Sequence, residues 1–550
     1  MEEVSKLGAP KSLLILSSGN INSNLIGELG PLATSHIPIP GGLFLDHQLN
    51  SLQQRYAQIF VTLDKSKNEL GRVLGSKHKN IKIYYGNSKE SIGETIISFL
   101  ADKDGPNSLD IVYGDSYNTS LFDDWSEKNL LFVSAFDGSS EWDQVNRDSN
   151  GELKFTEKSG GKADFTITGS FRILDTLTLK NSLVEAKVKK NEKSNIFHEG
   201  LKIYDNRVNS KIVFLEDKSW ADLGHRRTYF NQRRNLISNG ARVHNSLEFN
   251  TDEGWVRKFG DNNKIENELN WFLKLPSSLN KYVPHLKTEQ VEKSYSIQYI
   301  PSLNVGEHWI SENPKKDFWV DLFFKIDLML SEMNKHREEI SVNEVIIAKE
   351  SIYVGKVKDR FESLIGLLKA NNSMGSQELL ENKTVFNLDM VVEKICKAGT
   401  EASRLPHWNV VHGDLCFSNI IFDQISINPK VIDPRGSFGR VGIFGDPVYE
   451  LLKLSQCILG DYDYIAADLF NIITNGQELI LDYPQVKEHE WVKEYFREYL
   501  NERLLELGLS YQTFRILEAG LFLSASSLHP EKNHWLALTI KAKNIVEEAS

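Results

Sequence analysis

The chain has 550 residues, of which 40% are hydrophobic and 25% charged. This length exceeds what one hydrophobic core ordinarily supports, so we expect two or more domains. The composition is that of ordinary globular proteins, which excludes collagenous, coiled-coil and wholly disordered classes. The formal net charge of −11 argues against a generally basic nucleic-acid footprint, and no nucleic-acid partner is expected.

The cysteines and the N-terminal residues indicate the compartment. Cys396, Cys416 and Cys457 lie far apart and form no CxxC pair, a pattern that fits a reducing compartment without a disulfide framework or zinc site. The first twenty residues contain a short apolar run without the basic flank of a signal peptide. No window reaches the roughly 18 apolar residues of a membrane span. We therefore expect a cytoplasmic protein with no membrane span.

The first part of the chain alternates strand-like and helix-like segments. Short apolar runs at 12–16, 58–63, 81–85, 109–115 and 130–136 are typical of strands, and residues 44–56 and 91–101 between them have helical spacing. This alternation predicts an α/β domain with a mainly parallel sheet over residues 1–235. A hairpin is expected at 144–158, with Ser-Asn-Gly at its turn, and a charged loop at 186–196.

The pattern changes near residue 240. Residues 246–260 alternate like a hairpin, 265–276 have helical spacing, and 293–301 is a further strand. Long amphipathic stretches follow at 318–336, at 354–370 and over most of 447–508. The sequence thus predicts a second, α+β domain over residues 236–550, with a small lobe of about 236–303 and a helical lobe of about 304–550.

Residues 410–436, VVHGDLCFSNIIFDQISINPKVIDPRG, carry the strongest chemical pattern. Two short apolar strands flank a turn, so His412, Asp414, Asn419 and Asp433 should gather at one rim. Phosphoryl transfer needs such a set, because one carboxylate orients the attacking hydroxyl while an amide and a second carboxylate hold Mg²⁺ against the nucleotide phosphates. The spacing of Asp414 and Asn419 equals that of the kinase catalytic loop.

HGDLCFSN followed by VIDPRG resembles the aminoglycoside phosphotransferase and choline kinase family, whose fold is protein-kinase-like. The resemblance covers residues 236–550. It implies that Asp414 is the catalytic base, that His412 shapes the catalytic loop, and that Asn419 and Asp433 are Mg²⁺ ligands. Asp446 in GDPVYELLKL would support the loop. For His412, a purely structural role is the alternative to chemistry.

The same resemblance implies a lysine that binds the nucleotide phosphates and a glutamate that orients it. Lys258 in GWVRKFG is the candidate lysine, and Glu268 is its expected partner, with Glu266 as the rival. The alternative for Lys258 taken alone is a solvated strand lysine. The remaining predicted nucleotide contacts are Gly240 in a phosphate-covering loop at 238–246, and Gln298 and Tyr299 in a hinge at 297–301.

The first domain resembles the sugar-nucleotide and phosphocholine nucleotidyltransferases, which bind an NTP on a doubly wound sheet. The matching segments, in order, are SLLILSSG (12–19), LGPLATSHIPIPGGLFLDHQL (29–49), IVYGDS (111–116), NGELKFTEK (150–158), TITGSFRI (166–173) and SWADLGHRRTY (219–229). The resemblance implies that Asp115 and Asp222 hold a divalent ion and that Glu157 and Lys158 face the substrate. A turn or cap role is the alternative for each aspartate.

The nucleotide loop departs from that family. The family's G-x-G-x-R stretch here reads GNINSNLIGELG (19–30), which keeps Gly19 but lacks the second glycine and the arginine. Thr34, Ser35 and His36 lie where the family has a lysine. Charge-assisted hydrogen bonds are each worth roughly 1.5–3 kcal/mol. Losing the arginine and the lysine should therefore weaken triphosphate binding by several kcal/mol.

Three hypotheses follow. The first is a bifunctional enzyme that uses Mg²⁺ and ATP to phosphorylate a sugar or small alcohol, then joins that product to a second NTP (CTP, GTP or UTP). It resembles enzymes that supply activated units for bacterial surface polysaccharides. The second keeps the kinase and makes the first domain a binding or oligomerisation module. The third is a non-catalytic scaffold, which leaves the set of Asp414, Asn419 and Asp433 without a function. The oligomeric state stays open, a homo-oligomer included.

Overall fold

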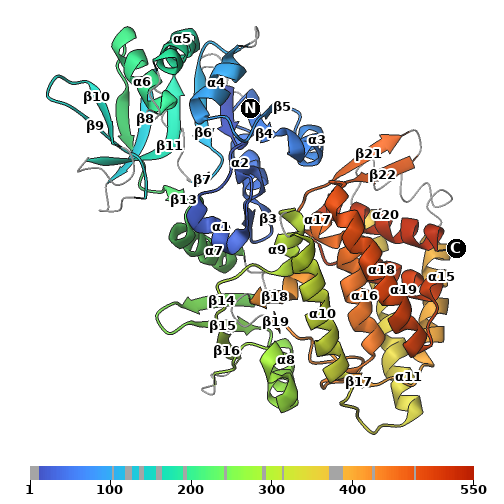
Figure 1. The fold of residues 1–550 in the computed structure, drawn as a ribbon. Helices are drawn as coiled ribbons and strands as arrows, with labels where there is room; N and C mark the ends of the chain where they lie inside the picture. The colour runs from blue at the N-terminus through green and yellow to red at the C-terminus, as the bar shows by residue number, and fades with distance from the viewer. Residues whose placement is uncertain are drawn as a thin grey trace. The chain divides into compact units, whose positions relative to one another are not determined.

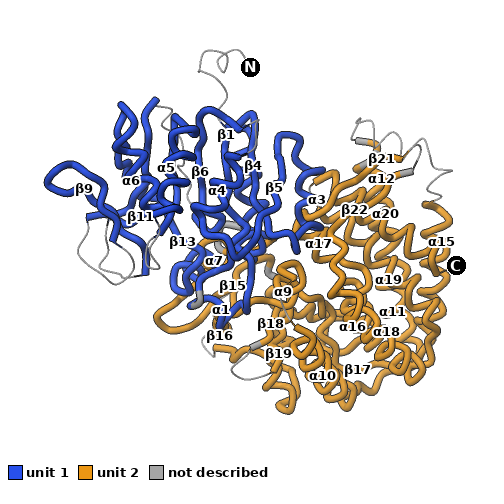
Figure 2. Tube along the Cα trace, turned by 45° about the horizontal axis from the view of Figure 1, so that its top comes forward, with its two compact units in different colours: residues 1–39, 43–233 blue, residues 40–42, 234–550 orange. Residues whose placement is uncertain are grey.

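The computed structural model describes most of the chain, and the predicted substrate residues Glu157 and Lys158 lie outside the described residues. The chain divides into two compact units (Figure 2): unit 1 comprises Met1–Ile39 and Leu43–Arg233, and unit 2 comprises Pro40–Gly42 and Arg234–Ser550. The described residues are 12–101, 105–117, 127–135, 141–156, 164–189, 195–240, 245–287, 293–312, 315–370, 388–423, 428–475, 478–529 and 531–549.

Unit 1 is built on a nine-stranded mixed sheet (Figure 1). β1 (Ser12–Leu16) lies between β6 (Leu109–Tyr113) and β4 (Gln58–Asp64), and β5 (Ile81–Gly86) follows β4; all three pairings are parallel. The predicted parallel arrangement holds for these four strands. β11 (Phe165–Ile173) pairs antiparallel with β6, so the sheet continues as a mixed one. The other strands of this sheet are β8 (Leu130–Ala135), β9 (Gln144–Arg147), β10 (Leu153–Thr156) and β12 (Val213–Glu216).

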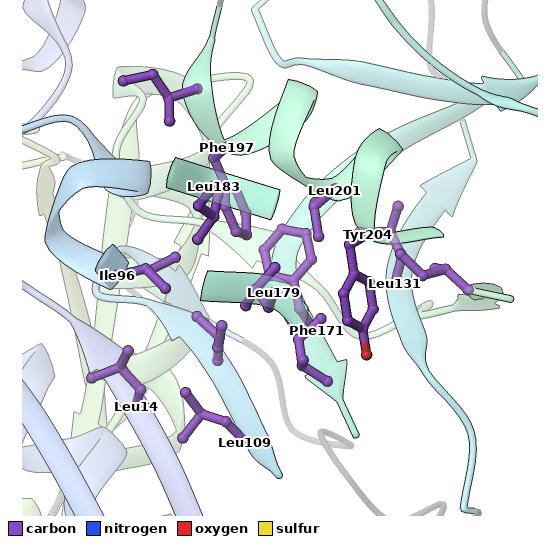
Figure 3. Packing of buried hydrophobic residues seen from close by; sticks show 14 of the residues in the cluster. Leu14, Ile96, Leu109, Leu131, Phe171, Leu179, Leu183, Phe197, Leu201 and Tyr204 are labelled. Atoms are coloured by element: carbon purple, nitrogen blue, oxygen red, sulfur yellow. The ribbon is translucent and has the colours of Figure 1, made fainter. Parts of the chain in front are cut away.

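Helices cover both faces of this sheet. Those described are α1 (Ser23–Leu29), α2 (Phe44–Leu52), α3 (Asn68–Lys77), α4 (Ile92–Leu100), α5 (Thr176–Val188), α6 (Ile196–Arg207) and α7 (Arg226–Gly240), which runs on into unit 2. Leu14 and Phe60 belong to the face that packs on α4, α5 and α6, as Figure 3 shows for Leu14, Ile96, Leu183 and Phe197. Side chains of a strand alternate between the two faces of a sheet, so Leu63 of β4 lies on the opposite face from Phe60. There α3 packs closely on Leu63, because a Cβ added to Gly71 of α3 would lie 3.0 Å from it.

Unit 2 combines a small sheet with a helical part (Figure 1). β14 (Asn245–Asn250), β15 (Trp255–Gly260) and β16 (Ser294–Gln298) form an antiparallel sheet, and α8 (Asn262–Lys274) follows β15, which confirms the predicted hairpin and helix. The described helices that follow are α9 (Val305–Ile310), α10 (Lys316–Met333), α11 (Val342–Glu350), α12 (Lys356–Ala370), α15 (Leu388–Ser403), α16 (Pro447–Ile458), α17 (Tyr462–Ala466), α18 (Lys487–Leu507), α19 (Tyr511–Ser526) and α20 (Lys532–Glu548).

Three two-stranded hairpins or ladders complete unit 2. They are β17 (Asn409–Val410) with β20 (Phe444–Gly445), β18 (Ile420–Asp423) with β19 (Asn428–Val431), and β21 (Asn471–Asn475) with β22 (Glu478–Asp482). The last pair corrects the prediction that most of 447–508 is helical. Asn-Gly at 475–476 is the strongest short hairpin pattern, and the β-branched residues Ile472, Ile473 and Thr474 directly precede it.

The prediction of a charged loop at 186–196 is also wrong at both ends of that range. Residues 186–188 complete α5, and α6 begins at Ile196 with Asn195 as its N-cap. Lys187 and Lys189 lie at the C-terminal end of α5, where the helix dipole favours cations, so this charge belongs to a helix end. Across the described ranges, no helix has the length and apolarity needed to cross a bilayer.

Candidate functional site

β15 and α8 bring Lys258 and Glu268 together inside unit 2. Lys258 lies on the middle strand of the small sheet, and its Nζ is 2.8 Å from Glu268 Oε2. The Tyr295 hydroxyl donates to the same oxygen at 2.7 Å, which fixes the carboxylate from β16. Both ion-pair partners are buried, whereas the rival Glu266 is exposed on the same helix. The structure therefore pairs the predicted nucleotide lysine with Glu268.

Asp433 is the second carboxylate that contacts Lys258. It follows β19, and its Oδ1 is 2.9 Å from Lys258 Nζ. Burial lowers the Lys258 pKa, but the Asp433 and Glu268 carboxylates outweigh it and hold this pKa above its usual value. Asp433 has a φ of 57°, in the left-handed region that aspartate and asparagine tolerate better than most residues. That backbone turns the side chain back toward the lysine.

The predicted catalytic loop holds Asp414 between an amide and a lysine. Asn419 Nδ2 donates to the Asp414 carbonyl at 2.9 Å and to its Oδ2 at 3.2 Å. Lys453 Nζ of α16 lies 2.9 Å from Asp414 Oδ1. Burial raises the Asp414 pKa, but Lys453 and Arg435 overcome it and hold this pKa well below the usual value. The Asp414 side chain is 42% exposed, so the carboxylate is both ionised and accessible.

His412 lies fully buried behind this loop. Its Nε2 donates to the Ile432 carbonyl at 2.9 Å, and its Nδ1 accepts from the Asp414 amide at 3.3 Å. Burial lowers the His412 pKa to about 4, so the ring is neutral at ordinary pH. Trp271 packs edge-on against the ring. These contacts tie the catalytic loop to the Asp433 segment, and they leave no ring nitrogen facing the reactants.

The start of α16 anchors the loop from below. Gly413 N donates to Glu450 Oε1 at 2.8 Å, and burial raises the Glu450 pKa to about 7. Asp446, which the family resemblance assigns to loop support, is the N-cap of α16 and accepts from Val448 N. It also pairs with Lys349 at 3.0 Å, and both side chains are wholly buried. Asp446 thus acts on the loop through the helix that carries Glu450.

One cavity of about 810 Å³ joins these groups within unit 2. Lys258, Glu268, Asp414, Asn419 and Asp433 all line it. An ionised carboxylate, a second carboxylate and an amide are hard oxygen donors of the kind Mg²⁺ prefers. Within the described ranges, no cluster of three or more His, Cys, Asp or Glu side chains is arranged to hold a metal ion. The oxygens of a bound nucleotide would have to complete the coordination.

Three of the predicted nucleotide residues do not line this cavity. Gly240 is the last residue of α7, and residues 241–244 of the predicted phosphate-covering loop lie outside the described residues. Gln298 ends β16 with an exposed side chain, and its backbone N–H donates to His285 O at 2.8 Å. Tyr299 N donates to Gly254 O, and its ring packs edge-on against Phe249.

Sequence reasoning missed the cations at the far end of the cavity. Arg435 and Lys356 bind the buried Tyr449 hydroxyl at 3.1 and 3.4 Å, and Arg360 also lines the cavity. Burial raises the Tyr449 pKa, but Lys356, Arg435 and Lys453 bring it down to about 7. Tyr449, Lys453 and Gln456 follow helical spacing along one face of α16. That polar stripe is the pattern that could have revealed them.

In unit 1 the predicted carboxylates Asp115 and Asp222 converge on one glycine. β7 (Ser116–Tyr117) pairs with β13 (Ala221–Asp222), which brings the two segments side by side. A Cβ added to Gly224 would lie 2.6 Å from Asp115 Oδ2 and 3.2 Å from Asp222 Oδ1. Asp222 is buried and is hydrogen-bonded to His225 Nδ1. The two aspartates therefore meet, as a shared metal would require.

The nucleotide loop predicted in unit 1 takes a different form from the family pattern. Residues 23–29 are helix α1, capped by Asn22, whose side chain also contacts His225 Nε2 at 2.9 Å. Gly19 O accepts hydrogen bonds from Thr34 N and Thr34 Oγ1 at 2.8 and 3.2 Å. Arg226 of α7 pairs with Glu28 of α1 at 2.6 Å. An arginine thus reaches this segment from α7.

No family model and no curated protein matches the chain. Among solved structures, 42% of this chain matches 98% of the inositol-1-phosphate CTP transferase from T. maritima, at 14% identity and a TM-score of 0.35. The same share matches 100% of the CTP:phosphocholine cytidylyltransferase from Streptococcus pneumoniae, at 12% identity and a TM-score of 0.34. The nucleoside-diphosphate-sugar pyrophosphorylase from Vibrio cholerae RC9 matches 40% of this chain over 99% of its own, at 14% identity and a TM-score of 0.32.

Proposed function

We propose that unit 2 transfers the γ-phosphoryl group of ATP, bound with Mg²⁺, to a hydroxyl of a small molecule. The observation that carries this proposal is the single cavity in which Lys258, held by Glu268, lies with Asp433, Asp414 and Asn419. A cation for the nucleotide phosphates, oxygen donors for a metal and an ionised carboxylate for the acceptor are the parts that phosphoryl transfer needs.

Each residue has a defined task in this proposal. Lys258 binds the α- and β-phosphates, and Glu268 keeps its ammonium group pointing into the cavity. Asn419 and Asp433 hold Mg²⁺, which neutralises the phosphate charge when bound. Asp414 accepts a hydrogen bond from the acceptor hydroxyl and orients it for in-line attack. A carboxylate of such low pKa is a weak base, which suits a loose transition state in which the proton leaves late.

For unit 1 we propose a nucleotidyltransferase that joins the phosphorylated product to CTP, GTP or UTP. The meeting of Asp115 and Asp222 at Gly224 supports it, because two carboxylates can share one divalent ion with the reacting phosphates. The pairing of activities also has chemical logic, since the first product is the second substrate. Activated units of this kind serve surface polysaccharide synthesis, which is the pathway we propose.

A non-catalytic unit 1 is the second candidate. The sequence from Gly19 to His36 contains no lysine or arginine, and a triphosphate normally requires such donors. In this alternative, unit 1 binds a ligand or a second chain and unit 2 alone is catalytic.

Calorimetric titration of the full chain with the Mg²⁺ complexes of ATP, CTP, GTP and UTP tests both proposals. Asp433→Asn removes one charge from the unit 2 site and keeps a residue that tolerates the left-handed backbone. Asp468→Asn is the matched control, because Asp468 has the same φ of 57° and does not line the cavity.

We expect wild type and Asp468→Asn to bind two nucleotides, and Asp433→Asn to lose only ATP. A single ATP site lost in Asp433→Asn would instead favour the non-catalytic unit 1. If Asp433→Asn and Asp468→Asn bind ATP equally well, the assignment of the unit 2 site is wrong.

A further inference from the structure

The cavity of unit 2 has two ends with different charge. At the nucleotide end, Asp261, Glu268 and Asp433 accompany Lys258 and Lys264. The lining also holds four cations, three of which contact Asp414 or Tyr449, and we call Lys356, Arg360, Arg435 and Lys453 the cationic end. Lys356 and Arg360 lie one turn apart on α12, Lys453 is on α16, and Arg435 follows Asp433. Three separate segments therefore direct positive charge to one place.

The cationic end is not balanced by the acidic residues that line the cavity. Of those residues, only Asp414 contacts it, through Lys453 at 2.9 Å. Lys356 and Arg435 share the Tyr449 hydroxyl, which near neutral pH carries at most part of one negative charge against these cations. Burial lowers the Lys356 pKa, and Arg435 and Lys453 lower it further, as expected where like charges crowd together. Crowded, half-buried cations cost free energy unless an anion joins them.

We propose that the acceptor is itself an anion: an alcohol that carries a phosphate group, which the cationic end binds while Asp414 orients the hydroxyl. This inference rests on the proposed kinase function of the same site. A single arginine can satisfy a carboxylate with two parallel hydrogen bonds. Two lysines and two arginines from three segments are better matched to a phosphate dianion with three free oxygens. The same charges repel amines, which excludes choline-like and aminosugar acceptors.

The reaction then balances as an ordinary phosphoryl transfer. The acceptor oxygen forms a bond to the γ-phosphorus, and the bond from that phosphorus to the bridging oxygen of ADP breaks, with ADP taking the electron pair. The hydroxyl proton passes to Asp414 and from there to solvent. The product carries two phosphate groups, and the one that was present at the start stays on the cationic end throughout.

The competing assignment is that these cations bind the phosphates of ATP. An anion-binding measurement on the nucleotide-loaded protein separates the two. The probe is inorganic phosphate, titrated into the full chain saturated with Mg²⁺ and a non-hydrolysable ATP analogue. The test variant is Lys356→Met/Arg360→Met, which removes two cations of the cationic end. The control is Lys358→Met/Lys369→Met, which removes two exposed cations of the same helix.

We expect wild type and the control to bind phosphate alike, and the test variant to bind it at least about tenfold more weakly. Two results overturn the proposal: the absence of phosphate binding to the nucleotide-loaded wild type, or equal affinity in all three proteins. The analogue's own affinity provides the check on folding, because it should stay within about twofold in every variant.

Turnover with matched acceptors then identifies the charged group that the site prefers on its acceptor. ADP formation is followed with glycerol, glycerol 3-phosphate, glycerate and ethanolamine, and with glucose, glucose 6-phosphate, glucuronate and glucosamine. We expect the phosphate member to be fastest in its set, and its KM to rise at least about tenfold in the test variant while KM for ATP is unchanged. Faster turnover of a carboxylate, neutral or amine member overturns the inference and leaves the kinase standing. Failure of ATP to bind at all overturns the proposed function instead.

Discussion

The candidate sites of units 1 and 2 differ in how their charges are matched. In unit 2, Glu268 and Asp433 contact Lys258, and Asp414 contacts Lys453. In unit 1, Asp222 contacts His225, and the segment from Gly19 to His36 has no lysine or arginine of its own. Several ion pairs therefore organise the unit 2 site before any ligand arrives, whereas the two carboxylates that lie close together in unit 1 would gain from a divalent ion between them.

Asp414→Asn should produce the largest effect and separate the two sites. Asparagine cannot take the hydroxyl proton, so we expect kcat for phosphoryl transfer to fall about 10²–10⁴-fold with little change in ATP affinity. Single-turnover ADP formation measures the loss. Asp115→Ala in unit 1 is the reciprocal variant, and it should abolish nucleotidyl transfer without affecting the kinase. Loss of both activities in either folded variant would contradict two independent sites.

Lys258→Met should raise KM for ATP by roughly 10–150-fold, the equivalent of one charge-assisted contact. Glu268→Gln should act in the same direction through the misplaced lysine. Steady-state kinetics on both, and on the double variant, would reveal coupling between the two positions. Glu266→Gln is the control, because Glu266 is exposed on the same helix. An equal effect of the Glu266 and Glu268 substitutions would contradict the pairing.

Glu450→Gln should make the free energy of unfolding of unit 2 less sensitive to rising pH. Burial raises the Glu450 pKa from 4.5 to about 7, so the folded protein keeps a proton that the unfolded chain releases. The stability from this proton is full below about pH 4.5 and is lost as the pH rises through about 7. Between these two pH values the free energy of unfolding should fall by roughly 1–3 kcal/mol more in the wild type than in the variant.

Urea unfolding at pH 4.5 and pH 8 measures this difference. Glutamine keeps an oxygen that accepts from Gly413 N, so the loop contact survives the substitution. Burial also raises the pKa of Asp463 to about 7, but Asp463 is present in both proteins and cancels in the comparison. Parallel pH dependence in the two proteins would show that Glu450 does not hold its proton in the folded state.

Gly224→Ala should cost unit 1 about 1–3 kcal/mol of stability, because the new Cβ would lie 2.6 Å from Asp115 Oδ2. Gly19→Ala is the matched control, since no atom lies within 4 Å of its added Cβ. Thermal unfolding of both variants makes the comparison. A larger loss for Gly19→Ala would mean that the two aspartates do not crowd Gly224.

The sequence predicted contacts that lie within short spacings and missed those set by tertiary packing. Asp414 and Asn419 are five residues apart, so the local turn alone brings them together. The pairing of Lys258 with Glu268 came from family resemblance, whereas the contact of Lys258 with Asp433, which joins distant segments, was not predicted. Lys356 belongs to no motif, and Lys453 lies in GDPVYELLKL, where only Asp446 was given a role; the packing of α12 and α16 around Tyr449 gathers the two lysines.

Secondary structure followed the same division. The strands of unit 1 were predictable because they are short continuous apolar runs, and the hairpin of β14 and β15 because its residues alternate with a period of two. The β21 and β22 hairpin was missed within a helical stretch, although its Asn-Gly turn is visible in the sequence. The antiparallel pairing of β11 with β6 could not be predicted, since strand order depends on contacts distant in the chain.

Tyr449 makes the arrival of an anion at the cavity a proton-coupled event. Its pKa of about 7 means that near neutral pH the phenol is partly ionised, with its negative charge held by Lys356, Arg435 and Lys453. An incoming anion takes over those cations, so the phenolate loses its stabilisation and binds a proton from the buffer. The heat of binding will therefore change with the ionisation enthalpy of the buffer, and replacing this single hydroxyl with the hydrogen of phenylalanine would remove the part of that change that comes from the phenol.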